Sequence, residues 1–343
     1  MKDVVLLADP KTSAWDFANK IKDYIKEKKE KEISLLKLEM TRFRDKENLP
    51  YVPENIRKKD VYFIQSPNKH PNNWWVELLL VKDLCLSASV NSLSFVLSNM
   101  RYSRQDRKHR SRVPVSSRAL ANSISPGLQR IITMDLHSPQ IQNAYPANVP
   151  LDNLHSFPEA VKYLRQNHFG DLENLVLVSP DAGGVHRTMS YMKKLIYANA
   201  DDQFNHAMTG KGSSLAFHNY SFAMISKIRE KPGEIEKMIL TGDVKDKNVL
   251  IVDDIYDSCG TSIEAGKLLR EEGAKKLLVY ATHGLFTKGT KEILENFDIV
   301  MTSNTHYKPS KNNGNIEIID MTPIFAEAIY RAQEGLSISK LFD

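Results

Sequence analysis

Short β-rich runs alternate with amphipathic segments along most of the chain. The runs are rich in β-branched and aromatic residues, which favours strands, and the segments between them carry apolar residues at helical spacing. Such alternation predicts βαβ units. The predicted fold class is therefore α/β, with mainly parallel sheets flanked by helices. The expected strands are Val61–Gln65, Leu93–Leu97, Arg130–Met134, Leu175–Val178, Val249–Val252, Leu277–Ala281 and Ile316–Ile319, and the expected helices are Trp74–Leu86, Gly184–Ile196 and Ser262–Glu272.

The chain has 343 residues, enough for two domains that each bury a core. Prolines interrupt the alternation near Asn148–Pro158, so we expect one domain at residues 1–152 and a second at residues 153–343. The segment Ala198–Tyr220 shows no convincing periodicity and is expected to form a long exposed loop. Its Gly-Lys-Gly sequence lacks the earlier glycine and the leading strand of a Walker A loop.

Charge, apolar runs and cysteines indicate which ligands and which compartment the protein has. The net charge of +5 suggests anionic ligands without requiring nucleic acid. The N-terminus predicts a first strand rather than a signal peptide, and no apolar stretch approaches the length that spans a bilayer. The two cysteines, Cys85 and Cys259, lack metal-ligand spacing and are not expected to form a disulfide. We therefore expect a cytoplasmic protein with no membrane segment.

Residues 248–270 carry the strongest chemical signal. An apolar run ends there in two acids, Asp253 and Asp254, and a turn with small hydroxyl residues leads into the predicted helix. Backbone N–H groups of such a turn and the positive end of the helix converge on one point, which suits phosphate. The two acids suit a sugar diol or the shell of Mg²⁺. The alternative is a helix cap flanked by solvated acids.

Residues 252–261 resemble the phosphoribosyl diphosphate binding signature of type I phosphoribosyltransferase-like proteins, and specifically of ribose-phosphate diphosphokinases. The motif by itself leaves phosphoribosyltransferases open. Three further matches, spread from about residue 43 to the C-terminal Ser337–Phe342, favour the diphosphokinases. The resemblance implies that ribose 5-phosphate binds at Asp253, Asp254, Asp257, Ser258, Cys259, Gly260 and Thr261.

A basic run, Arg101–Arg112, holds six cations in twelve residues. Taken alone, it is typical of a solvated basic face or an RNA-binding patch. A triphosphate needs such charge too, and arginine forks suit phosphate oxygens. The resemblance assigns the run to an ATP site, with Arg104, Gln105 and Arg112 as nucleotide contacts.

Residues 43–47 resemble the adenine loop of the same family. Phe43, Asp45 and Glu47 match its pattern, whereas Arg44 and Lys46 replace smaller residues. Without the resemblance, Phe43 would be interpreted as simple packing.

Two further loops follow predicted strands. Thr133-Met134-Asp135-Leu136-His137 ends in a histidine, which in most proteins is structural. Ser179-Pro180-Asp181-Ala182-Gly183-Gly184 places an acid beside two glycines, which alone indicates a tight turn or a backbone approach to diphosphate. The resemblance implies that His137 and Asp181 are Mg²⁺ ligands.

The pair Lys227 and Arg229 matches the Lys-x-Arg pair of the family's catalytic loop, which implies stabilisation of the transition state; as charges alone they indicate an exposed loop. The resemblance further implies two phosphoribosyltransferase-like domains, ATP and ribose 5-phosphate as substrates, and a homo-oligomer, commonly a hexamer, with phosphate and ADP as effectors. Two alternatives stay open: a phosphoribosyltransferase that consumes phosphoribosyl diphosphate, and a non-catalytic regulatory subunit of the family.

Overall fold

The computed structural model describes residues 1, 3–209, 219–228, 237–307 and 315–342. The chain forms two compact units: unit 1 contains Met1–His155 and Asp320–Asp343, and unit 2 contains Ser156–Ile319. Among the helices of these described ranges, none combines the length and the apolar character needed to cross a bilayer.

Unit 1 is built on a parallel sheet in the order β2-β1-β5-β6-β7-β8, beside a separate antiparallel hairpin of β3 and β4. The residues of β1, β5, β6 and β7 are almost continuously buried, as expected for strands covered on both faces. Its elements are β1 (Val4–Ala8), α1 (Ser13–Lys29), β2 (Ser34–Lys37), β3 (Glu39–Arg42), β4 (Asn48–Tyr51), β5 (Asp60–Gln65), α2 (Pro71–Ser87), β6 (Ser92–Leu97), α3 (Ser116–Ile124), β7 (Arg130–Met134), the 3₁₀ helix η1 (Pro139–Ala144), β8 (Leu151–Leu154), α8 (Thr322–Gln333) and the 3₁₀ helix η3 (Ser339–Leu341).

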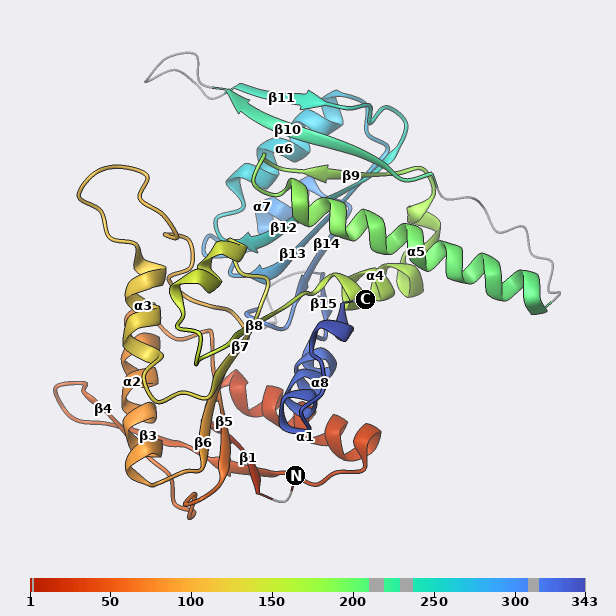
Figure 1. Cartoon of the computed structure of the whole chain (residues 1–343). Coiled ribbons are helices and arrows are strands. Elements are labelled where there is room, and N and C mark those ends of the chain that lie inside the picture. The colour runs from red at the N-terminus through yellow and green to blue at the C-terminus, as the bar shows by residue number, and fades with distance from the viewer. Residues whose placement is uncertain (2, 210–218, 229–236, 308–314, 343) are drawn as a thin grey trace. The chain divides into compact units, whose positions relative to one another are not determined.

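Helices cover both faces of this sheet (Figure 1). On one face, Trp74 and Leu78 of α2 and Leu120 of α3 join Phe63 and Phe95 of the strands in one buried apolar cluster. The rings of the two phenylalanines meet edge to face, with centroids 5.7 Å apart. Helices α1 and α8 lie on the other face.

The C-terminal segment differs from the expected division of domains. We expected residues 153–343 to form one domain, but Asp320–Asp343 belongs to unit 1. Helix α8 packs on α1 through Phe325 and Phe17, whose ring centroids are 5.3 Å apart. The Lys29 ammonium lies 2.7 Å from Glu327 at the same contact. An amphipathic pattern shows that a helix has a core to cover, but it does not show which sheet supplies that core.

Unit 2 contains the longer sheet, in the order β11-β10-β9-β12-β13-β14-β15. Its neighbouring strands are parallel except for the pair β10 and β11, which is antiparallel. Its elements are α4 (Phe157–Asn167), the 3₁₀ helix η2 (Phe169–Leu172), β9 (Leu175–Ser179), α5 (Val185–Thr209), β10 (Ser221–Ile228), β11 (Lys237–Thr241), β12 (Asn248–Tyr256), α6 (Gly260–Glu271), β13 (Lys276–Gly284), α7 (Lys291–Asn296), β14 (Ile299–Ser303) and β15 (Ile316–Ile319).

The strand order of unit 2 reverses between β9 and β12. From β9 the chain passes through α5 to β10 on one side, and from β12 it passes through α6 to β13 on the other side. The chain therefore leaves the carboxyl ends of these two neighbouring strands in opposite directions. Open α/β sheets bind their ligands at such a reversal.

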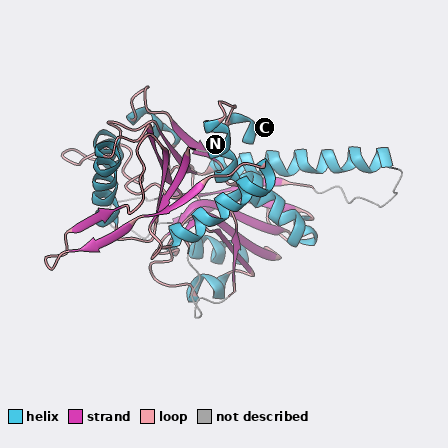
Figure 2. Cartoon of the chain, turned by 90° about the horizontal axis from the view of Figure 1, so that it is seen from below, coloured by secondary structure: helices cyan, strands magenta, loops and turns pink. Residues whose placement is uncertain are grey.

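The expected strands are all present, with ends within a few residues of the predicted ones except at β12 and β13. Strand β12 runs on to Tyr256, so both Asp253 and Asp254 belong to the strand instead of following it. The loop expected at Ala198–Tyr220 is wrong over its first half, because α5 continues to Thr209 (Figure 2). Residues 198–209 contain neither glycine nor proline, so nothing in them stops a helix that has already started. Residues 210–218 lie outside the described chain.

The contact between α8 and α1 predicts a measurable contribution to unit 1. Truncating a buried phenylalanine removes apolar contacts and leaves a cavity, so Phe325→Ala and Phe17→Ala should each cost about 3 kcal/mol. The double variant should cost about 1 kcal/mol less than the sum, because the rings contact each other. The measurement is urea unfolding followed by tryptophan fluorescence, since Trp15, Trp74 and Trp75 all lie in unit 1.

The matched control is Phe297→Ala, which removes a buried ring from the core of unit 2. It should change the tryptophan-detected transition much less than either variant of unit 1. An unchanged transition in Phe325→Ala would show that α8 does not stabilise unit 1.

Candidate active site

The loop between β12 and α6 is held to the end of β13. The Tyr256 carbonyl accepts the backbone N–H groups of Leu285 and Phe286 at 2.7 and 3.0 Å, and the Thr287 hydroxyl donates to the Asp257 carboxylate at 2.6 Å. These bonds join the carboxyl ends of two adjacent strands. The loop therefore has a defined position relative to the sheet.

The start of α6 is open toward solvent. Cys259, the N-cap residue, has φ +61°, a left-handed conformation that turns the chain sharply into the helix, and its side chain does not cap the helix within the described chain. Ser258, Gly260 and Thr261 are exposed. The first N–H groups and the positive end of a helix, with hydroxyl donors beside them, form an anion-binding arrangement.

Asp253 and Asp254 are joined by an arginine that sequence reasoning missed. Arg187 Nη1 lies 3.2 Å from Asp253 Oδ1, and Arg187 Nη2 lies 3.3 Å from Asp254 Oδ1. The backbone N–H of Asp254 also donates to Asp253 Oδ1 at 2.8 Å. All three side chains are largely buried. Two carboxylates and one guanidinium thus form a compact cluster at the reversal of strand order.

Electrostatics in this cluster act in opposite directions. Burial raises the pKa of the Asp253 carboxyl well above its ordinary value, and the charge of Asp254 raises it further. Arg187 lowers the pKa of Asp253, because its positive charge favours the ionised form. The positive charge of the guanidinium therefore offsets the repulsion between two adjacent carboxylates that are largely removed from water.

The loop at 179–184 lies at the end of β9, next to this cluster in the sheet. Asp181 is exposed, and its Oδ1 accepts the backbone N–H of Gly184 at 2.8 Å. The Ser179 hydroxyl donates to the Asp181 carbonyl at 2.7 Å. A Cβ on Gly184 would lie 2.9 Å from that hydroxyl oxygen. The glycine thus permits the close approach on which the turn depends.

The predicted residues of the nucleotide site lie in two separate parts of unit 1. Phe43, Asp45 and Glu47 form the tip of the β3–β4 hairpin, where the Phe43 N–H donates to the Glu47 carbonyl at 2.9 Å. Phe43 is 56% exposed, which excludes simple packing within this chain. Figure 1 shows the hairpin and the loop that precedes α3 projecting at different places, so one copy of unit 1 does not bring the two sets together.

Arg104, Gln105 and Arg112 lie in that loop before α3, after the carboxyl end of β6. The two arginines are exposed. The Gln105 side-chain amide donates to the Arg107 carbonyl at 2.8 Å and lies 3.0 Å from His109 Nδ1. Gln105 thus organises the loop in which both exposed arginines lie.

The two expected metal ligands belong to different units. His137 is exposed after the carboxyl end of β7 in unit 1, and Asp181 is exposed after β9 in unit 2. Within the described residues, no three His, Cys, Asp or Glu side chains gather in a cluster that would hold a metal by itself.

The catalytic pair predicted from the resemblance lies at the edge of the described chain. Lys227 is part of β10, and its backbone pairs with Met238 of β11. Its side chain and the whole of Arg229 lie outside the described structure.

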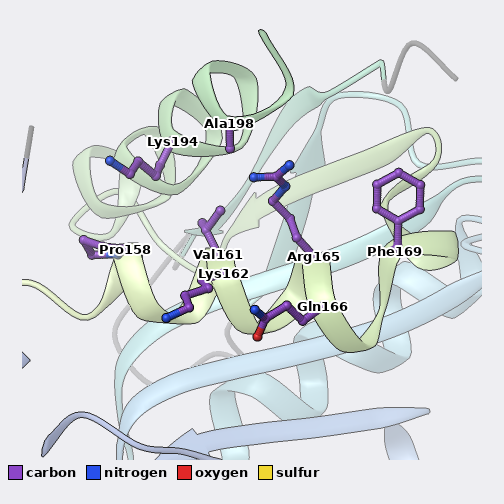
Figure 3. Close-up of a pocket in the computed structure, with 8 residues that line it drawn as sticks. All are labelled: Pro158, Val161, Lys162, Arg165, Gln166, Phe169, Lys194 and Ala198. Atoms are coloured by element: carbon purple, nitrogen blue, oxygen red, sulfur yellow. The ribbon is translucent and has the colours of Figure 1, made fainter. Parts of the chain in front are cut away.

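A groove elsewhere in unit 2 contains none of the predicted site residues. It lies between α4 and α5 and has a volume of about 400 Å³ (Figure 3). Its lining mixes apolar and basic side chains: Pro158, Val161, Lys162, Arg165, Gln166, Phe169, Lys194 and Ala198. The candidate site is the loop cluster at the ends of β9 and β12, not this groove.

The position of Arg187 in the sequence is itself an indication of a functional role. It stands in the first turn of α5, where the helix dipole disfavours a cation. A basic residue placed there next to a Gly-Gly turn indicates an anionic partner. Its partners, however, lie 66 and 67 positions later in the chain, so local sequence does not identify them.

Two family models and two curated relatives match most of the chain. Residues 10–126 match the model of the N-terminal domain of ribose phosphate pyrophosphokinase, and residues 171–343 match the model of the phosphoribosyl synthetase-associated domain. Ribose-phosphate pyrophosphokinase 4 of Saccharomyces cerevisiae is 36% identical over 314 residues, which cover 90% of this chain and 88% of that protein. Ribose-phosphate pyrophosphokinase 2 of the same yeast is 35% identical and covers 90% of each chain.

A solved structure gives the same result. The phosphoribosylpyrophosphate synthetase from Mycobacterium smegmatis matches with a TM-score of 0.80 at 25% identity, covering 97% of this chain and 100% of that one. The match extends through both units, and the expected fold of two mainly parallel sheets flanked by helices is confirmed. The chain belongs to the ribose-phosphate pyrophosphokinase family.

Proposed function

We propose that this chain transfers the β,γ-diphosphate of ATP to the 1-hydroxyl of ribose 5-phosphate, which gives phosphoribosyl diphosphate and AMP. The observation that carries the proposal is the pairing of an open helix start with the Asp253–Arg187–Asp254 cluster at the strand reversal of unit 2. That arrangement offers donors for a phosphate and acceptors for hydroxyl groups side by side. A phosphorylated sugar needs both.

The acceptor half of the proposed site holds ribose 5-phosphate. Ser258, Gly260 and Thr261 at the start of α6 would bind the 5-phosphate, because hydroxyl and backbone N–H donors converge there. Asp253 and Asp254 would accept hydrogen bonds from the ribose hydroxyls, since ionised carboxylates are pure acceptors. The sugar would then be fixed at both ends, which orients its 1-hydroxyl for attack on the β-phosphorus of ATP.

The donor half would bind ATP through unit 1. Arg104 and Arg112 present exposed charge for the triphosphate, and Phe43 on the hairpin supplies an exposed ring for the adenine base. Asp45, Glu47 and Gln105 complete the predicted set. The exposed guanidinium groups favour phosphate over a buried structural role.

We propose Mg²⁺ as the metal, with His137 and Asp181 as its protein ligands. Mg²⁺ prefers oxygen donors, keeps several waters and usually binds through one or two carboxylates together with substrate phosphates. The exposed Asp181 carboxylate fits that pattern. When bound, the ion would neutralise charge on the diphosphate. Lys227 and Arg229 would contribute positive charge where it develops in the transition state.

A homo-oligomer is part of the proposal, with a hexamer as the expected form and phosphate and ADP as expected effectors. The hairpin supports this, because it exposes Leu49 and Tyr51 as well as Phe43, and apolar residues grouped in this way mark contact surfaces. In such an oligomer, the hairpin of one copy would meet the loop before α3 of another copy. The two sets of predicted nucleotide residues would then lie together. A cytoplasmic location is proposed as well, since both cysteines are free thiols.

The direct test is turnover. Purified chain incubated with ATP, ribose 5-phosphate and Mg²⁺ should form AMP and phosphoribosyl diphosphate in equal amounts, measured by anion-exchange chromatography. Absence of AMP above a control without ribose 5-phosphate, with and without added phosphate, would favour the non-catalytic subunit. Release of diphosphate from phosphoribosyl diphosphate and a nucleobase would favour the transferase.

Lys227→Ala should lower kcat by roughly 100-fold or more and change KM for either substrate by less than about threefold, because a contact made mainly in the transition state affects turnover rather than binding. The measurement is steady-state kinetics against both substrates. The matched control is Lys245→Ala, which removes an exposed lysine of the same unit. Equal losses in binding and turnover would make Lys227 a substrate anchor.

The proposed reaction needs no covalent intermediate on Cys259, and the thiols can be used to check this. Burial raises the pKa of Cys85 and of Cys259 to about 12, so at pH 8 the thiolate fraction should be roughly 1,000-fold below that of an ordinary cysteine. Ellman's reagent should therefore react slowly with the native chain and rapidly after unfolding in guanidinium. Cys85→Ala isolates Cys259, and fast native reaction of that variant would contradict the expectation.

A further inference from the structure

Arg187 projects from one side of the strand reversal to the other. It stands in the first turn of α5, directly after the loop at the end of β9, and its guanidinium reaches the two acids of β12. The start of α5 is fixed by Gly184, whose carbonyl accepts the N–H and the hydroxyl of Thr188 at 3.0 and 3.1 Å. The backbone at Arg187 is therefore held in place by contacts that do not involve the two acids.

The sheet leaves room for this side chain beside β12. Pairing between β12 and β9 ends at Ile251 and Val178, whereas β12 continues along β13 as far as Tyr256. Arg187 reaches Asp253 and Asp254 in the part of β12 that extends past its pairing with β9. Asp253 and Asp254 are successive residues of a strand, and such side chains normally point to opposite faces of the sheet. The guanidinium of Arg187 has two terminal nitrogens in one plane, so it can bind one oxygen of each carboxylate.

We infer that Arg187 is a positioning residue, which holds the Asp253 and Asp254 carboxylates in the arrangement that receives the hydroxyl groups of ribose 5-phosphate. The inference rests on the proposed function of this loop. Arg187 acts through the two acids and does not itself contact the substrate.

Two physical reasons make the arginine necessary. Adjacent carboxylates repel each other, and partial burial removes the water that would screen them, so without a cation they would separate or bind a proton. A protonated acid offers a donor in place of one acceptor, which is the wrong partner for a hydroxyl that donates. A lysine would supply the charge, but its single ammonium cannot hold two oxygens in the planar geometry of a guanidinium.

The test measures binding of two sugars that differ by one hydroxyl. Ribose 5-phosphate and 2-deoxyribose 5-phosphate are titrated by calorimetry into the full chain, with Mg²⁺ and α,β-methylene ATP present; this analogue replaces the bond that the proposed reaction breaks. In Arg187→Met the Kd for ribose 5-phosphate should rise roughly 30-fold, and the Kd for the deoxy sugar should rise only about fivefold, because that sugar keeps the 3-hydroxyl for the acids to hold but lacks the 2-hydroxyl. Arg187→Lys should show the same pattern with a smaller change.

Comparing the change in Kd for the two sugars distinguishes a positioning role of Arg187 from a role in phosphate binding or in the fold. Equal weakening of both sugars in Arg187→Met would show that the arginine binds the phosphate or only supports the fold, and would overturn the inference. Unchanged binding of both sugars would overturn it as well. Should Arg187→Met fail to fold, as judged by circular dichroism, the comparison is made with Arg187→Lys. The matched control is Lys193→Met, an exposed position on the same helix that should leave both Kd values unchanged.

The same titration distinguishes this inference from the proposed function. A wild-type chain that binds ribose 5-phosphate through its hydroxyls and yet forms no AMP would contradict the function and leave the role of Arg187 standing. A chain that forms AMP and whose Arg187→Met variant does not discriminate the two sugars would contradict the inference by itself. A wild-type chain that binds neither sugar would overturn both.

Discussion

The bridge from Arg187 to Asp253 and Asp254 is the interaction on which the candidate site depends. Two acids at the end of a buried strand are unfavourable unless a cation lies between them, and the fold brings that cation from the helix after the neighbouring strand. The bridge therefore joins the first turn of α5 to the end of β12, across the reversal of strand order.

The reversal of strand order explains why the loops after β9 and β12 meet. Residues 179–184 and 253–261 are far apart in sequence, but β9 and β12 are neighbours in the sheet and end at the same edge. Glycine at 184 permits a close turn on one side, and the left-handed Cys259 produces a sharp turn on the other. The site offers donors from the start of α6 and acceptors from β12, which is the combination that a phosphorylated sugar requires.

Much of this arrangement could be predicted from local sequence. Buried parallel strands are nearly continuous apolar runs, which predicts Arg130–Met134 with its observed bounds. The edge strand Ile316–Ile319 is only partly buried, and its three isoleucines predict it with its observed bounds as well. The loop at 253–261 was recognised because its residue types carry the chemistry. The continuation of α5 to Thr209 does not follow from apolar periodicity, which is weak at residues 198–209, although those residues contain neither glycine nor proline to end a helix. The place of α8 in unit 1 and the partners of Arg187 depend on tertiary contacts, which local patterns do not encode.

A crystal structure of the chain with ribose 5-phosphate tests the central claim most directly, namely that the carboxyl ends of β9 and β12, with the start of α6, form the sugar-phosphate site. The account predicts the 5-phosphate at the start of α6, within hydrogen-bonding distance of Ser258 and Thr261, and ribose hydroxyls on Asp253 and Asp254 with the Arg187 bridge intact. A sugar phosphate bound in the groove between α4 and α5, or bound at α6 with its hydroxyls turned away from the two acids, would contradict it.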